Sequence, residues 1–339
     1  MRAALALVLL VACTSPAAPT EYAWELPPGF QPPPVPADNP MSADKVELGR
    51  ALFSDPRLSG NGTQSCASCH DSALAFTDGK PVAIGSTGQH GRHGAMSLLD
   101  VGYSASLTWS SDVPTLEAQA LRPMYGTAPV ELGLDHANDT SLVAQLDDAY
   151  GDLFASAFPD DEPSIDTVER AIAAYERTLT SGRSRFDRFV AGDTTALSPA
   201  EQHGGQLFES DMLACTHCHG GFTTSSNVLD RNVFFNTGLY RTYPANDRGL
   251  IEVTNVATDE GRFRPPPLRN IALTAPYMHD GSAATLDDVI DIYVKGGRGD
   301  GALDPHKAPQ MTGFVLSPQD RADLIAFLGA LTDVPTVGP

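Results

Sequence analysis

The sequence predicts a mainly α-helical protein that consists of two similar domains. The main observation is a short motif, C-x-x-C-H, which stands once in each half of the chain, at residues 66–70 and 215–219. Before each copy stands a similar stretch, G-R-A-L-F at 49–53 and G-G-Q-L-F at 204–208, followed by a polar loop. Apolar residues also recur at helical spacing in both halves. The repetition indicates a duplicated unit, and the spacing indicates that each unit is helical.

The motif itself is the attachment signature of a c-type haem. Two thiols three positions apart lie on neighbouring sides of one helical turn, where each forms a thioether to the haem edge. The histidine that follows is then placed under the iron as its proximal ligand. The expected haem-binding residues are Cys66, Cys69 and His70 in the first half and Cys215, Cys218 and His219 in the second. The sequence therefore predicts two covalently bound haem c groups.

Other uses of the four cysteines are less consistent with the pattern. Structural zinc pairs lie closer together in sequence and need no histidine directly after each pair. A thioredoxin-like redox pair would stand near a βαβ pattern, and none is visible. Two structural disulfides remain an alternative in an exported chain.

The composition is acidic, with 42 Asp and Glu against 22 Lys and Arg and a formal net charge of −20 in 339 residues. Nucleic acids and anionic lipid surfaces are recognised by basic faces, so neither is expected as a partner. The charge suits a cationic protein partner or a small neutral substrate, and it equally suits a role in solubility alone. The length suggests two domains with tails.

The N-terminus has the features of an export signal. A basic residue precedes a short apolar run at 3–12, which is too short to span a membrane as a helix. The run L-V-A-C that ends at Cys13 resembles a bacterial lipobox, so residues 1–12 are expected to be a lipoprotein signal peptide and Cys13 to be lipidated. The alternative is an ordinary signal peptide cut nearby, such as after Ala18. The mature protein is therefore expected in the periplasm or on the cell surface, bound to the membrane only through its lipid.

The N-terminal domain is expected at residues 41–195, after a proline-rich linker at 13–40 that favours extended polyproline geometry. Its first helix should begin near Ser42, whose side chain is suited to cap it. A glycine-rich loop is expected after the first motif, at 78–94. Further helices are predicted at 116–121, 141–154 and 165–180.

The C-terminal domain is expected at residues 196–333. Its last helix is predicted at 318–331, with Ser317 as the N-cap and Pro318 at the first helical position. Its apolar residues should pack against the second haem unit.

Longer stretches around the motifs carry a family resemblance. Residues 66–79 read C-A-S-C-H-D-S-A-L-A-F-T-D-G, and residues 273–281 read L-T-A-P-Y-M-H-D-G after P-L-R-N at 267–270. These stretches resemble the first haem site, and the segment before the C-terminal distal ligand, of bacterial di-haem cytochrome c peroxidases and MauG enzymes. The resemblance extends from about residue 40 to residue 333. It implies two c-type cytochrome-like domains packed with their haems near the domain interface, and a reaction with hydrogen peroxide.

The first haem site departs from the common pattern of this family. Typical members carry an Ile-Gly-His run whose histidine blocks the iron until the enzyme is reduced, whereas here the run is Ile84-Gly85-Ser86. Because serine is a poor ligand of haem iron, the resemblance implies a first haem with an open face for peroxide. His90 and His93 are alternative ligands nearby.

The second haem site departs as well. The position of the usual methionine ligand holds Tyr293, which implies a His/Tyr haem of the MauG and MbnH type. A phenolate favours the higher oxidation states of iron, and Met278 is the alternative ligand. The run L-T-W that ends at Trp109, with Met96 upstream, makes the resemblance closest to the MbnH-type enzymes.

The resemblance also assigns roles near the haems. Trp109 matches a tryptophan that lies between them and is expected to relay oxidising equivalents, although a large aromatic side chain can also simply fill an interface. Glu131 and Gln119 match the pocket where a carboxyl moves the peroxide proton and an amide orients the ligand. Thr274 and Pro276 match positions whose backbone carbonyls hold a calcium ion, while the family's asparagine ligand aligns nearest to Gly94, with His93 adjacent.

The expected function is therefore that of an exported di-haem oxidoreductase. It would react with hydrogen peroxide at an open haem, share the oxidising equivalents with the His/Tyr haem, and oxidise a residue of a partner protein. By resemblance to MbnH, that residue is a tryptophan of a copper-binding partner. The alternatives are a cytochrome c peroxidase supplied with electrons by a small cytochrome, and a non-enzymatic di-haem electron carrier.

Overall fold

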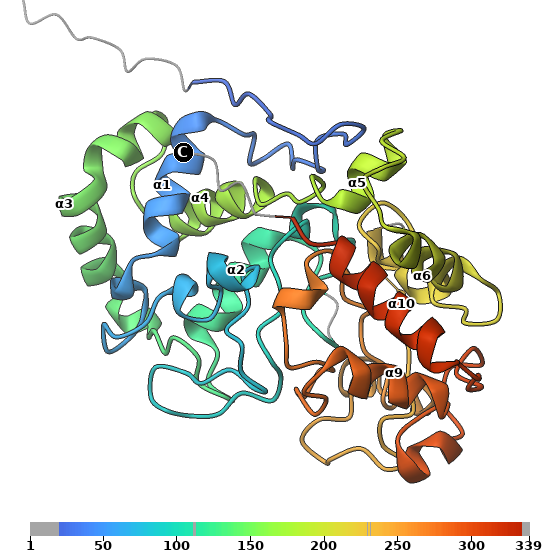
Figure 1. The fold of residues 1–339 in the computed structure, drawn as a ribbon. Coiled ribbons are helices and arrows are strands. Elements are labelled where there is room, and N and C mark those ends of the chain that lie inside the picture. Colours follow the sequence, from blue (N-terminus) through green and yellow to red (C-terminus); the bar gives the residue numbers. More distant parts are fainter. Residues whose placement is uncertain (1–19, 111–112, 229, 231, 334–339) are drawn as a thin grey trace, which may run out of the picture.

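The computed structural model of the chain describes residues 20–110, 113–228, 230 and 232–333. All of the regular structure in these ranges is helical, apart from isolated β-bridges. Figure 1 shows two groups of helices side by side, one from the N-terminal half of the chain and one from the C-terminal half. The expectation of a mainly α protein with two units is confirmed. The part of the chain that the structure describes contains no helix long and apolar enough to cross a membrane.

The N-terminal half contains four main helices, α1 (Ala43–Phe53), α2 (Leu116–Tyr125), α3 (Asp139–Ala157) and α4 (Ile165–Arg177). Ser42 caps α1 as predicted, because its side chain accepts a hydrogen bond from the backbone N–H of Lys45. Ser164 caps α4 in the same way through Thr167, and the helix ends three residues earlier than predicted. α3 is longer than predicted at both ends.

Helix α2 differs most from the prediction, which ended it at residue 121. The helix continues to Tyr125 with Pro123 inside it. Proline removes one backbone hydrogen bond, but near the C-terminal end of a helix few turns remain to be disrupted. The backbone N–H of Leu132 and of Leu134 donate to the carbonyls of Pro123 and Met124, so the following loop is tied back to this end of α2.

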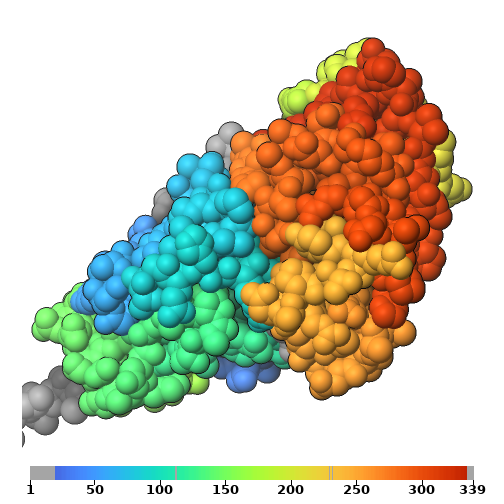
Figure 2. Space-filling view, turned by 90° about the horizontal axis from the view of Figure 1, so that it is seen from below, coloured from blue at the N-terminus to red at the C-terminus, as the bar shows by residue number. Residues whose placement is uncertain are grey.

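The C-terminal half contains six helices within the described ranges. They are α5 (Arg185–Val190), α6 (Pro199–Glu209), α7 (Thr216–His219), α8 (Ile251–Thr254), α9 (Leu286–Val294) and α10 (Pro318–Ala330). Ser317 caps α10 and Pro318 is its first residue, as predicted. Long irregular segments connect these helices, and they form much of the surface seen in Figure 2, where the two halves meet along a seam.

The two halves share one helix crossing, which supports the predicted duplication. α1 packs on α4 and α6 packs on α10. A Cβ atom at Gly49 of α1 would lie 1.9 Å from the carbonyl oxygen of Ala171, and one at Gly204 of α6 would lie 2.0 Å from that of Asp323. Both distances are far below van der Waals contact, so only glycine allows the helices to approach this closely.

The segment before α1 packs on the body instead of extending freely from it. Phe30 lies between an aromatic residue of each half, with its ring 6.1 Å from that of Tyr103 and 5.0 Å from that of Phe222. The hydroxyl of Tyr103 donates to the carbonyl of Gln31 at 2.7 Å. The expected linker at 13–40 is therefore attached to both halves over its described part. The predicted signal peptide at 1–12 and Cys13 lie outside the described residues.

Candidate active site at two histidines and the interface between them

The histidine of each C-x-x-C-H motif is oriented by a backbone carbonyl. Nδ1 of His70 lies 2.9 Å from the carbonyl oxygen of Phe76, and Nδ1 of His219 lies 3.1 Å from that of Pro266. An N–H at Nδ1 that donates to a carbonyl leaves Nε2 with its lone pair free, which is how metal-binding histidines are commonly held. Burial lowers the pKa of both rings, for His219 to about 4, so the neutral form that binds iron is favoured.

A large cavity lies beside His219, in the position where the second haem is expected. The motif residues Cys215 and Cys218 line it, together with Tyr293 and apolar side chains such as Leu328. The N-terminal half closes one side, through residues 77–80, 94–97 and Trp109. The cavity therefore reaches the interface between the two halves.

A buried arginine on the wall of this cavity suits a haem. Arg264 is buried and donates only to neutral groups, namely the carbonyl of Thr108, the hydroxyl of Ser104 and the sulfur of Met96. Burial without a carboxylate partner among the described residues lowers its pKa to about 10. A buried guanidinium that faces a cavity fits an anionic group there, such as a haem propionate.

Trp109 is held by backbone groups of both halves. Its indole N–H donates to the carbonyl of Gly94 at 2.9 Å, and its own carbonyl accepts from the backbone N–H of Arg264 at 2.8 Å. The ring lines the cavity of the C-terminal half. Gly94 is two residues before Met96, whose backbone lies beside the ring of His70. The structure thus places this tryptophan at the interface between the halves.

Comparison with known proteins agrees with this arrangement. A family model described as di-haem cytochrome c peroxidase matches residues 43–195, and one described as cytochrome c matches residues 202–332. The chain is 36% identical to the cytochrome-c peroxidase IdrP1 of Denitromonas iodatirespirans, over 97% of this chain and 92% of that protein. It is 34% identical to the methylamine utilization protein MauG of Methylorubrum extorquens, over 89% and 82% of the two chains.

The chain belongs to the di-haem cytochrome c peroxidase and MauG family. It is therefore a peroxidase-type oxidoreductase with two haem c groups. Among solved structures, it is similar to a MauG-like protein associated with microbial copper homeostasis, with a TM-score of 0.89 and 44% identity over 94% of this chain and 97% of the other. It also resembles the di-haem peroxidase BthA of Burkholderia thailandensis, with a TM-score of 0.71 and 26% identity over 88% of each chain.

The residue at the position of the family's blocking histidine is hydrogen-bonded to a neighbouring loop. The hydroxyl of Ser86 donates to the carbonyl of Leu132 at 2.9 Å, and its backbone N–H donates to the carbonyl of Glu131 at 2.7 Å. Gly85 makes this approach possible, because a Cβ atom there would lie 2.0 Å from the carbonyl oxygen of Val130. The loop at 84–86 thus supports the loop that carries Glu131.

Glu131 and Gln119 lie on connected parts of the first domain. Glu131 is half-buried on the loop that is tied to the end of α2, and Gln119 is half-buried on α2 itself, one turn before Pro123. Burial raises the pKa of the Glu131 carboxyl, and His93 opposes that shift. A raised pKa favours the protonated carboxyl group, which can donate a hydrogen bond.

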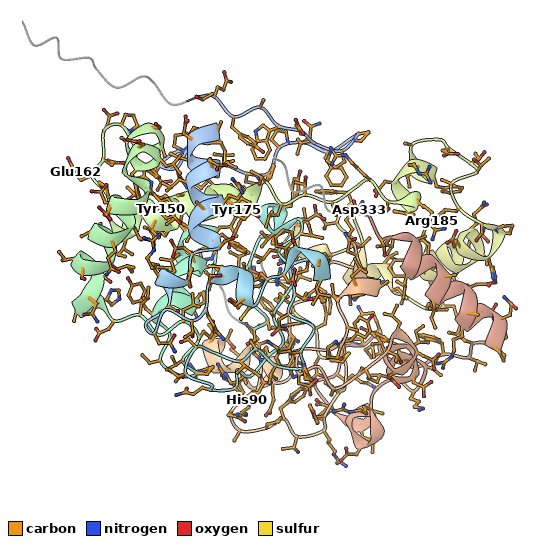
Figure 3. All side chains as sticks on the ribbon, turned by 60° about the vertical axis from the view of Figure 1, so that its left-hand side comes forward. His90, Tyr150, Glu162, Tyr175, Arg185 and Asp333 are labelled. Carbon is orange, nitrogen blue, oxygen red and sulfur yellow. The ribbon has the colours of Figure 1, made fainter. Side chains whose placement is uncertain are left out.

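The two alternative histidines lie in different surroundings. His90 is exposed and forms a β-bridge with Ile84, and Figure 3 places it on an outer loop. Nε2 of His93 lies 2.8 Å from a carboxylate oxygen of Asp247, in the other half of the chain. The imidazole is therefore engaged across the interface.

His93 is part of a cluster beside Trp109. Nε2 of His279 lies 3.3 Å from the second oxygen of Asp247, and its ring stacks on that of Phe263 at 3.7 Å. The rings of His93 and Trp109 are 6.5 Å apart. The nearby imidazoles and hydrogen bonds hold the pKa of the Asp247 carboxyl far below its usual range, against the effect of burial. A carboxylate shared by two imidazoles thus joins the halves next to the tryptophan.

Three side chains that can reach a second iron line the cavity beside His219, namely Tyr293, Met278 and Met311. Burial raises the pKa of the Tyr293 phenol, and the thiols of Cys218 and Cys215 add to the shift. No described residue makes a hydrogen bond to its hydroxyl. A buried phenol that faces a cavity without a partner is suited to an iron ligand, because metal binding removes the cost of its burial.

The expected calcium residues also lie on this wall. Thr274 and Pro276 line the cavity, and no described backbone N–H donates to the carbonyl of either residue. The described residues contain no group of three or more His, Cys, Asp or Glu side chains placed to hold a metal ion. A calcium ion here would therefore depend on carbonyls and water.

Sequence reasoning missed Asp247, His279 and Arg264. Asp247 is paired with His93, 154 positions away along the chain, and no local pattern predicts such a pair. Arg264 stands next to a run of prolines, where an arginine usually indicates a surface. The only local signal for Arg264 was its position. It stands directly before the run P-P-P, which leads into the family stretch at 267–270.

Proposed function

We propose that this enzyme uses hydrogen peroxide to oxidise a tryptophan of a copper-binding partner protein, in the manner of the MbnH-type enzymes. The observation that carries the proposal is Tyr293, a phenol without a partner on the same cavity wall as His219. A phenolate ligand favours the oxidised iron that such chemistry needs, whereas an electron-accepting cytochrome site is better served by methionine. The similarity to a MauG-like protein associated with copper homeostasis supports the choice of partner.

The residues present fit two haem c groups, held by Cys66, Cys69 and His70 and by Cys215, Cys218 and His219, with Tyr293 on the second iron. Haem iron supplies the redox chemistry with peroxide. Glu131 takes the proton from the inner oxygen of peroxide and returns it to the outer oxygen, which leaves as water. Its raised pKa suits this exchange, because burial makes the carboxylate a stronger base than an exposed one. Gln119 orients the peroxide through its amide.

Trp109 carries an electron from the C-terminal half to the N-terminal half. Its indole N–H donates to a carbonyl, which cannot accept the proton, so the ring gives and regains the electron without losing that proton. The ring of His93 lies 6.5 Å from that of Trp109, and the ring of Phe263 packs against His93 at 5.9 Å. The electron comes finally from the partner protein, which is oxidised at the surface without contact with peroxide.

We also propose the accessory features that the family resemblance implies. A calcium ion binds the carbonyls of Thr274 and Pro276 and holds the interface together. Cys13 carries the lipid, which keeps the enzyme at the membrane in the periplasm or on the cell surface. Metal analysis before and after chelation tests the first feature. Lipidation of Cys13 predicts that Cys13→Ala moves the protein into the soluble periplasmic fraction, and an unchanged distribution would refute lipidation.

The test of the proposed function is the product. The enzyme, peroxide and the secreted copper-binding protein encoded nearest to its gene are incubated together, and the partner is analysed by peptide mass spectrometry. We expect an oxygen-containing modification on one tryptophan that requires both enzyme and peroxide. Glu131→Gln should reduce the yield, and a partner that remains unmodified would contradict the proposal.

The second candidate is a cytochrome c peroxidase that only reduces peroxide. It is favoured by the relatives that bear this name, including IdrP1 of Denitromonas iodatirespirans. Its signature is rapid oxidation of a reduced small cytochrome by enzyme and peroxide. Fast cytochrome oxidation without any modified partner residue would make it the better account.

A further inference from the structure

The two halves can be aligned through their helix crossings. A Cβ atom at Gly49 would meet the carbonyl of Ala171 and the Cβ of Tyr175, and one at Gly204 would meet the carbonyl of Asp323 and the Cβ of Phe327. Both pairs of contacts are four residues apart on the second helix. The same register therefore applies along α4 and α10, and Figure 3 shows Tyr175 beside α1. One residue further along, Glu176 of α4 corresponds to Leu328 of α10.

This correspondence places a carboxyl where the other half has an apolar side chain. Leu328 lines the cavity of the second haem. By the same register, Glu176 faces the site of the first haem, and its charge acts on the thiol of Cys66 in the first motif. Only 4% of Glu176 is exposed, and its Oε2 atom has no hydrogen-bond partner in the described structure. Buried carboxyl oxygens are rarely left without a partner, so this atom is directed toward a group that binds there.

The charged groups around Glu176 do not compensate a negative charge on its carboxyl group. Arg177 is adjacent, but its guanidinium pairs with Glu117 of α2 at 2.8 Å. Glu117 adds a negative charge, and Cys66 of the first motif is neutral as a thioether. Burial raises the pKa of the Glu176 carboxyl to about 8, with Arg177 opposing the shift and Glu117 adding to it. The group is thus a neutral acid near pH 7 that releases its proton when positive charge appears nearby.

We propose that Glu176 is a redox-linked proton-release group of the first haem. When one electron is removed from that haem by an electrode mediator, the carboxylic acid releases one proton to solvent. When the haem regains the electron, the carboxylate takes up one proton. The net charge of the buried site is then unchanged in both directions, which favours oxidation in an interior that screens charge poorly. The proposal does not depend on which molecule finally supplies the electrons.

The corresponding position of the second half holds Leu328, which cannot exchange a proton, so any pH dependence of the second haem's potential has another source, such as its proposed ligand Tyr293. Control variants come from the same helix. Glu169 is half-buried on α4 and its pKa is raised to about 7, by burial first and by Asp166 and Glu117 next, but it lies two turns before Glu176.

The test is a spectroelectrochemical titration of both haems in the holoenzyme at several pH values from about pH 6 to about pH 10. The reduction potential of the first haem should fall with pH, and the redox equilibrium constant should change up to about tenfold per pH unit, which is 59 mV for one electron. In Glu176→Gln this slope should disappear. The reduction potentials of the two proteins should agree at acidic pH, and that of the wild type should be the lower one at alkaline pH. Glu169→Gln should retain the slope.

A second variant keeps the proposal open to refutation if Glu176→Gln does not fold. Glu176→Leu copies the residue of the other half and should also give a potential that is independent of pH. Thermal unfolding adds a readout without redox chemistry. Because the folded pKa is raised, wild-type stability should fall as pH rises from about 4.5 through about 8, and the variants should not follow this trend. An unchanged slope of the potential in both variants would overturn the proposal.

Discussion

The N-terminal and C-terminal halves of this enzyme hold the motif histidine in the same way but surround it with different residues. In each half a glycine lets two helices cross closely, a C-x-x-C-H motif follows, and a backbone carbonyl holds Nδ1 of the motif histidine. The carbonyl that orients His70 belongs to Phe76, six residues away, whereas that for His219 belongs to Pro266, 47 residues away. The support is thus similar in geometry but is built locally in one half and from a distant loop in the other.

The halves differ in the residues expected to lie opposite the motif histidine. In the first, the hydroxyl of Ser86 donates to a carbonyl of the loop that carries Glu131. In the second, Tyr293 faces the cavity with an unpartnered phenol. The comparison teaches that the duplicated helices hold the two motifs alike, while the later loops carry the residues in which the two sites differ.

The largest expected effect comes from removing one motif. Cys215→Ser together with Cys218→Ser should leave one covalent haem per chain instead of two, because each pair of thiols attaches its own group. Cys66→Ser with Cys69→Ser should leave the other one. A pyridine haemochrome assay counts the haems, and zinc in place of haem in the unaltered protein would end this account.

The chemistry of the open half is tested at Glu131. Glu131→Gln removes the proton exchange but keeps the size of the side chain, and should slow the reaction with peroxide by about 10²- to 10⁴-fold. Stopped-flow absorbance of the first haem measures this rate. Glu162→Gln, at an exposed position of the same half in Figure 3, is the matched control and should behave as the wild type. A rate equally unaffected in both variants would remove Glu131 from the mechanism.

The shared helix crossing predicts equal losses of stability in the two halves. Gly49→Ala and Gly204→Ala each place a Cβ against a backbone carbonyl, and should each lower the free energy of unfolding by about 1–3 kcal/mol or more. Gly329→Ala on α10 is the control, since nothing lies within 4 Å of its Cβ position, and it should stabilise by about 0.5–1 kcal/mol. Urea unfolding measures all three. A neutral result at Gly204 alone would show that the two crossings are not equivalent.

The smallest expected effect concerns the contact between the halves. The pKa of Asp247 is lowered in the folded protein, so its contribution to stability is present above about pH 4 and is lost as pH falls through the lower folded pKa. Asp247→Asn should therefore cost about 1–3 kcal/mol at neutral pH and little in acid. Thermal unfolding at both pH values tests this. Glu252→Gln, which breaks the exposed pair with Arg92 across the same interface, should change little.

Much of the scaffold was predictable because its signals are local. The caps at Ser42, Ser164 and Ser317 each act on a neighbour within three residues, and both C-x-x-C-H motifs are contiguous. Helix α2 was predicted too short, since proline usually ends a helix and the loop that supports its last turn returns from residues 132–134. Asp247 and His279 were missed because their partners lie in distant segments.

Glu176 shows a signal that could have been used. It lies four residues after Ile172 and eight after Val168, so it stands on the apolar stripe of α4. A carboxyl on such a stripe is either paired or functional, because burial of a charge is costly. The sequence alone offered no way to tell which, since its position relative to the haem depends on how α4 crosses α1.

The most direct test of the open first site and the tyrosine-bound second site is to add peroxide to the fully oxidised holoenzyme. Absorbance and Mössbauer spectra should show both haems changing without prior reduction, because the proposed function requires an open first iron and a phenolate of Tyr293 that lets the second haem hold an oxidising equivalent. In Trp109→Phe the first haem should still respond while the second lags, and Tyr293→Met should weaken the response of the second. An oxidised enzyme that stays inert to peroxide until it is half-reduced would contradict the account.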